Sequence, residues 1–587
     1  MKEFFKMVFA SILGVFVSFF VIFLLLIVFL AAIIASVDNE KVKVHANSVI
    51  HMSLDHPIQE RSSKNPFDQL DFAGFDNKAI GLNDILASLK RAKTDEKIKG
   101  IYLDLSSVQA GMATSEEIRN ALIDFKKSGK FVLAYSEVYS QGAYYLASVA
   151  DKIYLNPEGL LEFKGLGTEL AFFKGSLDKL EIEAQIIKVG TYKSAVEPFI
   201  LEKMSDANRQ QVTSFLGSMY DHFLNSVSSS RKIPKDSLFA IANQLKVQQA
   251  ADAVKYKLAD GLRYKDQIID ELKSRTGIEK DKDIKIVSLV DYSKNKTSDD
   301  SEAENRIAVV YANGEIIGGE GDNETIGSER ISKAIRDART NKKVKAVVLR
   351  INSPGGSALA SDVIWREVVL TKKVKPVIVS MGDVAASGGY YIACGADSIF
   401  AQPNTITGSI GVFGIIPNMQ KFFNNKLGIT FDRVKTGEFA DLGSISRPLT
   451  EGERLIIQNE VNRIYNTFTK RVSDGRKKPQ SYVDSIGQGR VWSGTEALKI
   501  GLVDKLGNID AAIRSAAKMA KLTDYKLVDY PAQKDPFESI FDTSEDKLKD
   551  YFAKKEMGEQ YQYFEQLKSA LKFTGIQARL PYTISVK

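Results

Sequence analysis

One serine is surrounded by residues that would leave its hydroxyl open to a substrate. Ser387 lies within 382–391 (GDVAASGGYY), after an apolar run typical of a buried strand, and its small neighbours would let a substrate backbone come close. Upstream, 352–357 (NSPGGS) follows another apolar run. Backbone N–H groups in its turn at Gly355 and Gly356 could meet a developing oxyanion. These residue types indicate nucleophilic attack on a carbonyl group.

A serine nucleophile needs a base, and the usual histidine is not suitably placed. The four histidines are His45, His51, His56 and His222, and none lies near a glycine-rich turn, which disfavours a Ser-His-Asp site. No Walker motif and no G-x-G-x-x-G turn after a strand occurs, which disfavours a nucleotide site. We expect the single cysteine, Cys394, to pack within a helix rather than to act as a second nucleophile.

An internal repeat divides the chain into two similar halves. The segment 98–105 (IKGIYLDL) is echoed by 344–351 (VKAVVLRI), about 246 residues later. The segment 142–147 (GAYYLA) is echoed in the same way by 388–393 (GGYYIA). The chain is therefore expected to be a tandem duplication.

The two halves carry different reactive residues. Ser387 of the second half aligns with Gln141, so the first half has no nucleophile. The first half has Lys193, which aligns with Ala440 of the second half. The simplest explanation is one composite site, built across the two halves or across subunits.

A lysine amine can serve as general base toward a serine hydroxyl only while it is neutral. An exposed lysine has a pKa of about 10.4 and is charged at pH 7. Burial can lower that pKa by about 3–5 units, so the fold must remove Lys193 from water. Ser409, within 407–411 (TGSIG), is expected to hydrogen-bond the amine.

Strands alternating with helices would position these residues. The short apolar runs 131–135 and 376–380 are typical of buried strands, and 115–127 and 451–476 have the pattern of helices. This alternation indicates an α/β fold with mainly parallel sheet in each half.

The N-terminus is apolar enough to span a membrane. Residues 8–36 are almost unbroken apolar residues, longer than the roughly 20 that cross a bilayer and too long for a cleaved signal peptide. We therefore expect an uncleaved signal anchor. Because Lys2 and Lys6 precede it, the positive-inside rule places the N-terminus in the cytoplasm. The remaining chain would lie on the extracytoplasmic side of the inner membrane, in a periplasm where the cell has one.

The composition is that of a folded protein with more than one domain. The chain has 587 residues, and single cores stop growing near about 250–300 residues. Hydrophobic residues make up 44% and charged residues 26%, which is ordinary globular composition. The 80 basic residues barely exceed the 73 acidic ones and form no basic run, which disfavours nucleic acid as a partner.

These patterns together predict five segments. They are an anchor at 1–40, a first repeat at 41–290 that supplies the lysine, a polar linker at 291–306, a second repeat at 307–525 that supplies the serine, and a helical segment at 526–587.

The sequence resembles the signal peptide peptidase SppA family in its long, duplicated form. The resemblance covers nearly the whole chain and includes the anchor and both halves. Its motifs, in order, are 190–199 (GTYKSAVEPF), the segment around Ser387, 407–411, 489–494 (GRVWSG) and 577–582 (QARLPY).

This resemblance implies a Clp-protease/crotonase-like fold in each half and a membrane-bound serine endopeptidase with a Ser-Lys dyad. It also implies a bowl-shaped homotetramer that degrades signal peptides left in the membrane, without a metal or other cofactor. Ser387 would be the nucleophile, Lys193 the general base and Ser409 the partner of the lysine. The N–H groups of Gly388 and Gly356 would form the oxyanion hole, and Gly355 is the alternative to Gly356.

Two other functions remain open at this point. Crotonase-like halves can bind acyl-CoA and polarise its thioester, although CoA substrates are cytosolic and these halves are expected outside. The chain could also be a non-enzymatic membrane scaffold, in which case Ser387→Ala would leave every phenotype unchanged.

A composite site predicts that neither half is active alone. Residues 41–290 and 307–525, expressed separately, should not cleave a synthetic signal peptide, because the lysine and the serine lie in different halves. Mass spectrometry of the peptide beside the full chain would test this. Cleavage by the second half alone would contradict the composite site.

Overall fold

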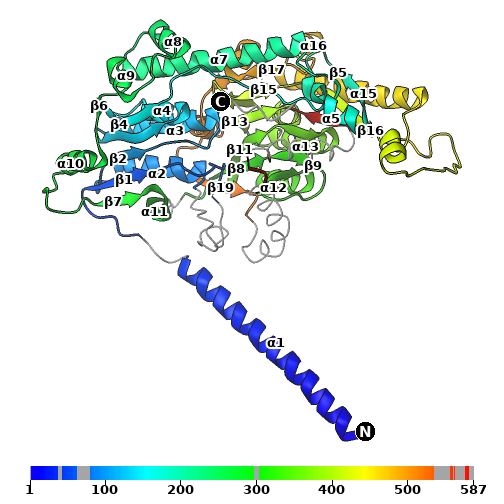
Figure 1. Cartoon of the computed structure of the whole chain (residues 1–587), viewed down its shortest axis with the longest axis horizontal. Helices are drawn as coiled ribbons and strands as arrows, with labels where there is room; N and C mark the ends of the chain where they lie inside the picture. The colour runs from blue at the N-terminus through cyan, green and yellow to red at the C-terminus, as the bar shows by residue number, and fades with distance from the viewer. Residues whose placement is uncertain are drawn as a thin grey trace.

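The structure is a computed structural model that describes residues 2–37, 42–62, 80–295, 303–533, 556–558, 561 and 576–580. Helix α1 (Lys2–Val37) extends away from the rest of the molecule (Figure 1). Its stretch Glu3–Leu25 has a mean hydropathy of 2.8 and is long and apolar enough to cross a membrane. This matches the expected position of the anchor.

The first half is a parallel sheet with helices packed on it. Its elements are β1 (Ser48–Met52), α2 (Leu82–Thr94), β2 (Ile98–Asp104), α3 (Met112–Lys126), β3 (Phe131–Tyr139), α4 (Gln141–Ala147), β4 (Lys152–Leu161), α5 (Lys174–Lys179), β5 (Glu183–Val189), η2 (Ser194–Val196), α6 (Glu197–Ile200), α7 (Asp206–Arg231), α8 (Lys235–Asn243), α9 (Ala250–Lys255), β6 (Gly261–Leu262), α10 (Lys265–Thr276), β7 (Ile286–Ser288) and α11 (Leu289–Lys294). The sheet order is β6-β4-β3-β2-β1-β7, and every neighbouring pair is parallel. Strands of such a sheet are buried on both faces, which explains their continuous apolar sequences.

The second half repeats this arrangement. Its elements are β8 (Arg306–Asn313), β9 (Glu315–Ile317), β10 (Thr325–Gly327), α12 (Ser328–Thr340), β11 (Val344–Ser353), β12 (Gly355–Ser357), α13 (Ala358–Lys372), β13 (Val377–Ala386), α14 (Gly388–Ala393), β14 (Ser398–Ala401), β15 (Ile406–Gly408), β16 (Val412–Asn418), η3 (Phe422–Lys426), α15 (Glu451–Arg476), α16 (Gln480–Ile486), β17 (Val491–Ser493), α17 (Gly494–Lys499), β18 (Lys505–Leu506), α18 (Ile509–Met519), β19 (Lys526–Tyr530) and β20 (Gln577–Arg579). Strands β18, β14, β13, β11, β8 and β19 take the places of β6, β4, β3, β2, β1 and β7. The predicted tandem duplication is confirmed.

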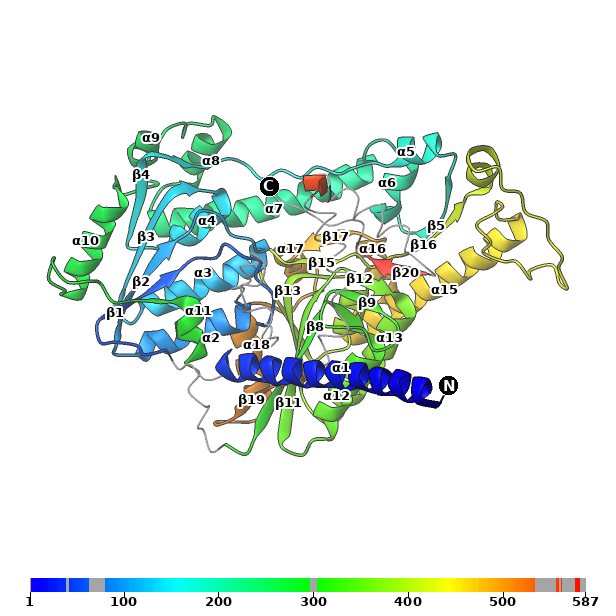
Figure 2. The ribbon, with the colours of Figure 1, turned by 60° about the horizontal axis from the view of Figure 1, so that its bottom comes forward.

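A further sheet joins the halves. Its order is β10-β9-β12-β20-β16-β5, and β5 comes from the first half while the other strands come later in the chain. Strand β5 pairs antiparallel with β16 along its whole length, from Val189 opposite Val412 to Glu183 opposite Asn418. Helix α7 also crosses both halves (Figures 1 and 2). The first half therefore contributes a strand and a long helix to the structure of the second half.

The ends of both repeats differ from the predicted boundaries. Strand β19 pairs with β8 as β7 pairs with β1, so the second repeat extends to Tyr530 rather than to 525. Helix α11 continues to Lys294, inside the expected linker, of which 296–302 lie outside the described residues. The segment 526–587, expected to be helical, contains the strands β19 and β20, and most of its other residues lie outside the described part. Pairing with distant strands decides these conformations, and local pattern does not contain that information.

Buried charges fix the two halves against each other. The guanidinium of Arg350 on β11 is fully buried and lies 2.8 Å from a carboxylate oxygen of Glu60 and 2.7 Å from one of Glu117 on α3. Nearby, Asp383 on β13 accepts hydrogen bonds from the N–H groups of Ala113 and Thr114, at 2.8 and 2.9 Å. It thereby caps α3, whose own N-cap residue is a glycine without a side chain.

Glu117→Ala should therefore destabilise the protein strongly. It leaves the buried Arg350 with one carboxylate instead of two, and breaking a buried pair of this kind costs about 3–5 kcal/mol. The measurement is the thermal unfolding midpoint of the full chain in detergent. Asp124→Ala is the control, because its partners Lys93 and Lys127 are more exposed and such pairs contribute about 0–1 kcal/mol. Equal shifts in the two variants would contradict this interpretation.

Candidate active site

Ser387 lies in a sharp turn between a strand and a helix. Strand β13 ends one residue before it and α14 begins one residue after it. Its φ angle of 53° is uncommon for a residue with a side chain. The backbone N–H of Ser387 donates to the carbonyl of Gly408 at 2.8 Å, and this bond holds the turn against β15.

The corresponding turn of the first half shows what is special about Ser387. There Gln141, which aligns with Ser387, is already the first residue of α4, and the cap is the preceding Ser140, with an ordinary φ of −64° and a hydroxyl that accepts a hydrogen bond from the N–H of Ala143. Ser387 makes no such cap with its side chain. Its hydroxyl is therefore directed to partners outside its own helix.

Lys193 reaches the same place from the first half. It follows β5 by four residues, and the pairing of β5 with β16 carries it into the second half. The backbone N–H of Tyr192 donates a hydrogen bond to the backbone carbonyl oxygen of Gln488 at 2.9 Å. Gln211 on α7 donates to the hydroxyl of Ser194 at 2.9 Å and accepts from the N–H of Val491 at 3.0 Å. Contacts on both sides of Lys193 thus fix its backbone to the second half.

Two glycines make room for the lysine side chain. A side chain at Gly489 would place its Cβ 2.7 Å from the Cα of Lys193, and one at Gly411 would place its Cβ 3.1 Å from the lysine Cδ. The glycines let the second half close around Lys193, which is completely buried.

The structure brings together the predicted serine, lysine and second serine. The Nζ of Lys193 lies 3.0 Å from the Oγ of Ser387 and 3.1 Å from the Oγ of Ser409. It also donates to the carbonyl oxygen of Arg579 at 2.5 Å. Ser387 and Ser409 are buried as completely as the lysine.

Burial changes the protonation of this amine. Desolvation lowers the pKa of Lys193 to about 7, so that near neutral pH a large fraction is neutral. A neutral amine has two N–H donors and one lone pair. Its donors can serve Ser409 and the carbonyl of Arg579, which leaves the lone pair to accept the hydroxyl proton of Ser387.

The glycine turn lies next to Ser387. The N–H of Gly355 already donates to the hydroxyl of Ser353 at 3.1 Å, which favours Gly356 as the oxyanion donor. A Cβ on Gly355 would lie 2.7 Å from the nitrogen of Gly388, so the turn and the start of α14 border the same small space. Two N–H groups from separate elements can converge there on one oxygen.

Sequence reasoning did not identify two groups around the lysine: one that holds the neighbouring backbone and one that accepts a hydrogen bond from the amine. Gln211 lies within a long helix with no motif around it, and only the fold shows that it joins Ser194 to Val491. The carbonyl of Arg579 is a backbone group, which no residue type could have indicated. Gly411 and Gly489 did fall within recognised motifs, although the sequence did not show that they adjoin Lys193.

The alternative nucleophile and bases lie elsewhere. Cys394 is buried in the core of the second half, and burial raises the pKa of its thiol to about 12, as expected for a packing residue. His222 pairs with Glu116 at 3.2 Å and His51 pairs with Asp104 at 3.1 Å, both in the first half.

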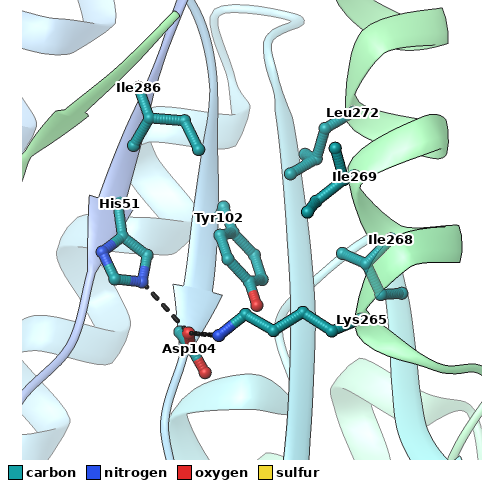
Figure 3. Close-up of a pocket in the computed structure, with 8 residues that line it drawn as sticks. All are labelled: His51, Tyr102, Asp104, Lys265, Ile268, Ile269, Leu272 and Ile286. Carbon is teal, nitrogen blue, oxygen red and sulfur yellow. Dashed lines mark hydrogen bonds and ion pairs between the residues drawn. The ribbon is translucent and has the colours of Figure 1, made fainter. Parts of the chain in front are cut away.

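The His51–Asp104 pair lines a separate hollow of about 180 Å³ (Figure 3). Lys265 approaches the same carboxylate at 3.2 Å. Although burial opposes it, the hydrogen bond from His51 and the Lys265 ammonium hold the pKa of Asp104 below its usual range. The other lining residues are Tyr102, Ile268, Ile269, Leu272 and Ile286. Among the residues that the structure describes, no serine, threonine or cysteine lines this hollow, so none of them offers the pair a nucleophile to activate.

Known proteins resemble the chain over most of its length. The family described as Peptidase family S49 matches residues 124–279 and 370–523, one segment in each half. The family described as Clp protease matches residues 299–407. Both matches lie on the repeated βα units that the structure shows.

Three relatives are representative. Protease 4 of Salmonella typhi is 39% identical over 473 residues, which cover 79% of this chain and 76% of that protein. Serine protease SPPA, chloroplastic, of Arabidopsis thaliana is 33% identical over 489 residues, which cover 82% of this chain and 70% of that protein. Putative signal peptide peptidase SppA of Enterococcus faecium is 33% identical over 241 residues, which cover 40% of this chain and 70% of that protein.

These matches favour a peptidase over an acyl-CoA enzyme or a scaffold, and they agree with the duplicated Clp-protease-like fold. The chain belongs to peptidase family S49 and is a serine protease made of two tandem domains.

Proposed function

We propose that Ser387 and Lys193 form the catalytic dyad of this protease and that it cleaves signal peptides and similar apolar peptides. The observation that carries the proposal is the 3.0 Å contact between the lysine Nζ and the serine Oγ in a completely buried site. The lowered pKa of Lys193 supports its role as the base.

The reaction follows from the positions of these groups. Ser387 attacks the peptide carbonyl carbon while its hydroxyl proton moves to the lone pair of Lys193. The carbonyl oxygen becomes an oxyanion, which the N–H groups of Gly388 and Gly356 stabilise. The lysine ammonium then gives its proton to the leaving amine nitrogen, and an acyl-enzyme remains. Water, deprotonated by the neutral lysine, hydrolyses that ester and restores Ser387.

Ser409 has a positioning role in this scheme. Its Oγ accepts from Lys193 at 3.1 Å, and its φ of 50° fixes it in a turn beside Gly408. This hydrogen bond orients the amine so that its lone pair faces Ser387.

Signal peptides are the substrate class that we infer. The Enterococcus faecium relative is described as a signal peptide peptidase, which supports this inference.

We further propose that α1 anchors the protein in the inner membrane with both halves on the periplasmic side. The apolar stretch Glu3–Leu25 supports the anchor, and Lys2 and Lys6 at its start support the orientation. A single anchor would keep the cleft near peptides that remain in the bilayer.

We propose that four copies of the chain assemble as a homotetramer. An exposed apolar arm supports contact between copies. This arm, residues 427–445, projects from the body between η3 and α15 (Figures 1 and 2). Its exposed side chains include Leu427, Ile429, Phe431, Val434, Phe439, Leu442 and Ile445, and Val434 is 98% exposed. Apolar surface of this kind marks contacts with other chains.

Removing either member of the dyad should abolish peptide cleavage. Ser387→Ala and Lys193→Met should each lower kcat/KM for a synthetic signal peptide by at least about 10³-fold, because nucleophile and base act as a unit. Methionine preserves much of the volume of the buried lysine. The full chain in detergent is assayed by mass spectrometry, with Lys188→Met on β5 as the control that should stay active. Full activity of Lys193→Met would rule out its role as base.

The proposed base also predicts the pH profile. The catalytic form has neutral Lys193, so kcat/KM should rise about tenfold per pH unit below 7 and level off above about pH 8. Thermal unfolding at each pH controls for loss of structure. A rate that is flat or falls between pH 6 and 8 on a stable enzyme would contradict the assignment.

A further inference from the structure

One turn of the second half contacts the backbone on which the proposed base is carried. This turn, residues 487–490, lies between α16 and β17 (Figure 1). The backbone carbonyl of its Gln488 accepts a hydrogen bond from the N–H of Tyr192 at 2.9 Å. Its Gly489 packs directly against the backbone of Lys193. The position of the lysine therefore depends on the position of this turn.

The same turn also holds the loop that carries Ser409. The N–H of Ser409 donates to the carbonyl oxygen of Arg490 at 2.7 Å. The N–H of Gly489 donates to the carbonyl oxygen of Ile410, also at 2.7 Å. A displacement of the turn would consequently move both the proposed base and the serine that orients it.

The turn contains a backbone conformation that its own sequence does not favour. Gln488 has a φ of 53°, in the left-handed region that few residues with a side chain adopt. Such a residue keeps this conformation where the surrounding structure holds it there. Gly489 continues the turn with a φ of 77°, which a glycine adopts freely. The contacts made by Gln488 should therefore decide how firmly the turn is held.

Tyr465 on α15 supplies these contacts. Its hydroxyl oxygen accepts hydrogen bonds from the backbone N–H and from the side-chain Nε2 of Gln488, both at 3.2 Å. The hydroxyl itself donates to the carboxylate of Asp484 on α16 at 2.6 Å. Burial and this hydrogen bond raise the pKa of the Tyr465 phenol, so the group stays protonated and can donate and accept at once.

The other end of the turn is held from the first half. Gln211 on α7 accepts a hydrogen bond from the N–H of Val491 at 3.0 Å and donates to the carbonyl of Tyr192 at 3.1 Å. Gln211 is completely buried, and Tyr465 is only 8% exposed. The turn is thus held at one end by a side chain from each half, and the contact from the second half is the tyrosine hydroxyl.

We propose that Tyr465 is a positioning residue for the dyad: its hydroxyl fixes the turn 487–490 and thereby keeps Lys193 enclosed and directed toward Ser387. This inference rests on the proposed roles of Ser387 and Lys193. It assigns a function to a residue outside every motif that the sequence indicated. A loosened turn would admit water to the lysine, and the pKa of Lys193 would then rise toward that of an exposed lysine.

The test is Tyr465→Phe, which removes the hydroxyl and keeps the ring in the core of the second half. The full chain in detergent is assayed with a synthetic signal peptide between pH 6 and 9. We expect kcat to fall at least about tenfold while KM changes by less than about twofold, since the hydroxyl orients the base and does not bind the peptide. The midpoint of the rise in kcat/KM with pH should move up by at least about half a pH unit, because a hydrated amine loses its proton at higher pH.

Tyr292→Phe on α11 is the matched control. Tyr292 is 1% exposed, and its hydroxyl donates to the carboxylate of Asp95 at 3.0 Å, within the first half. This variant loses the same kind of buried hydrogen bond, so it should keep the kcat and the pH midpoint of the unsubstituted chain. Thermal unfolding reports the stability of both variants. Equal changes in the two variants, or no change in Tyr465→Phe, would overturn the positioning role.

A second variant tests the same contacts without altering the tyrosine. Asp484→Ala removes the acceptor of the Tyr465 hydroxyl and of the Gln488 side chain. It should lower kcat and raise the pH midpoint in the same direction, by less than Tyr465→Phe. Unchanged kcat and midpoint in Asp484→Ala would overturn the proposal even where Tyr465→Phe does not fold.

The dyad variants in the same assay separate this inference from the proposed function. Loss of cleavage in Ser387→Ala and Lys193→Met, with full activity and an unchanged pH profile in Tyr465→Phe, would overturn the positioning role and leave the dyad standing. Cleavage by Lys193→Met would overturn the dyad, and the inference about Tyr465 with it.

Discussion

The chemistry proposed here depends on keeping one lysine amine out of water. Its contacts are two hydroxyl groups, a backbone carbonyl and, 5.7 Å away, the ring of Phe413. A carboxylate in contact with Lys193 would stabilise the ammonium and raise its pKa again. Because these contacts carry no charge, desolvation acts unopposed and the pKa falls to about 7.

The lysine and the serine come from different halves, so a small slide of one half would separate them. Three kinds of contact oppose such a slide: the β5–β16 pairing, the buried pairs of Arg350, and the cap that Asp383 places on α3. Asp383 lies on β13, which ends one residue before Ser387, so the same strand caps α3 and positions Ser387. Catalytic groups gain from such rigid elements because small displacements cost much rate.

The sequence was sufficient for the fold class and the duplication, and it singled out the serine and the lysine that the structure brings together. Buried parallel strands leave apolar runs, and the comparison of Ser387 with Gln141 indicated which half carries the candidate nucleophile. The sequence could not show the pairing of β19 with β8 or the place of β20, because both depend on strands far away in the chain. Nor could it show Gln211 or the carbonyl of Arg579, whose roles arise only when the halves meet.

Residues that pack around Lys193 come from late in the chain. Gly489 packs against its backbone and Gln488 bonds the residue before it, almost three hundred positions further on. During synthesis, a ribosome that has made residue 193 has therefore not yet made the surroundings that would lower its pKa. The amine stays solvated and protonated until the second half has folded around it. Under the proposed mechanism, the protease would therefore lack its base until both halves have folded.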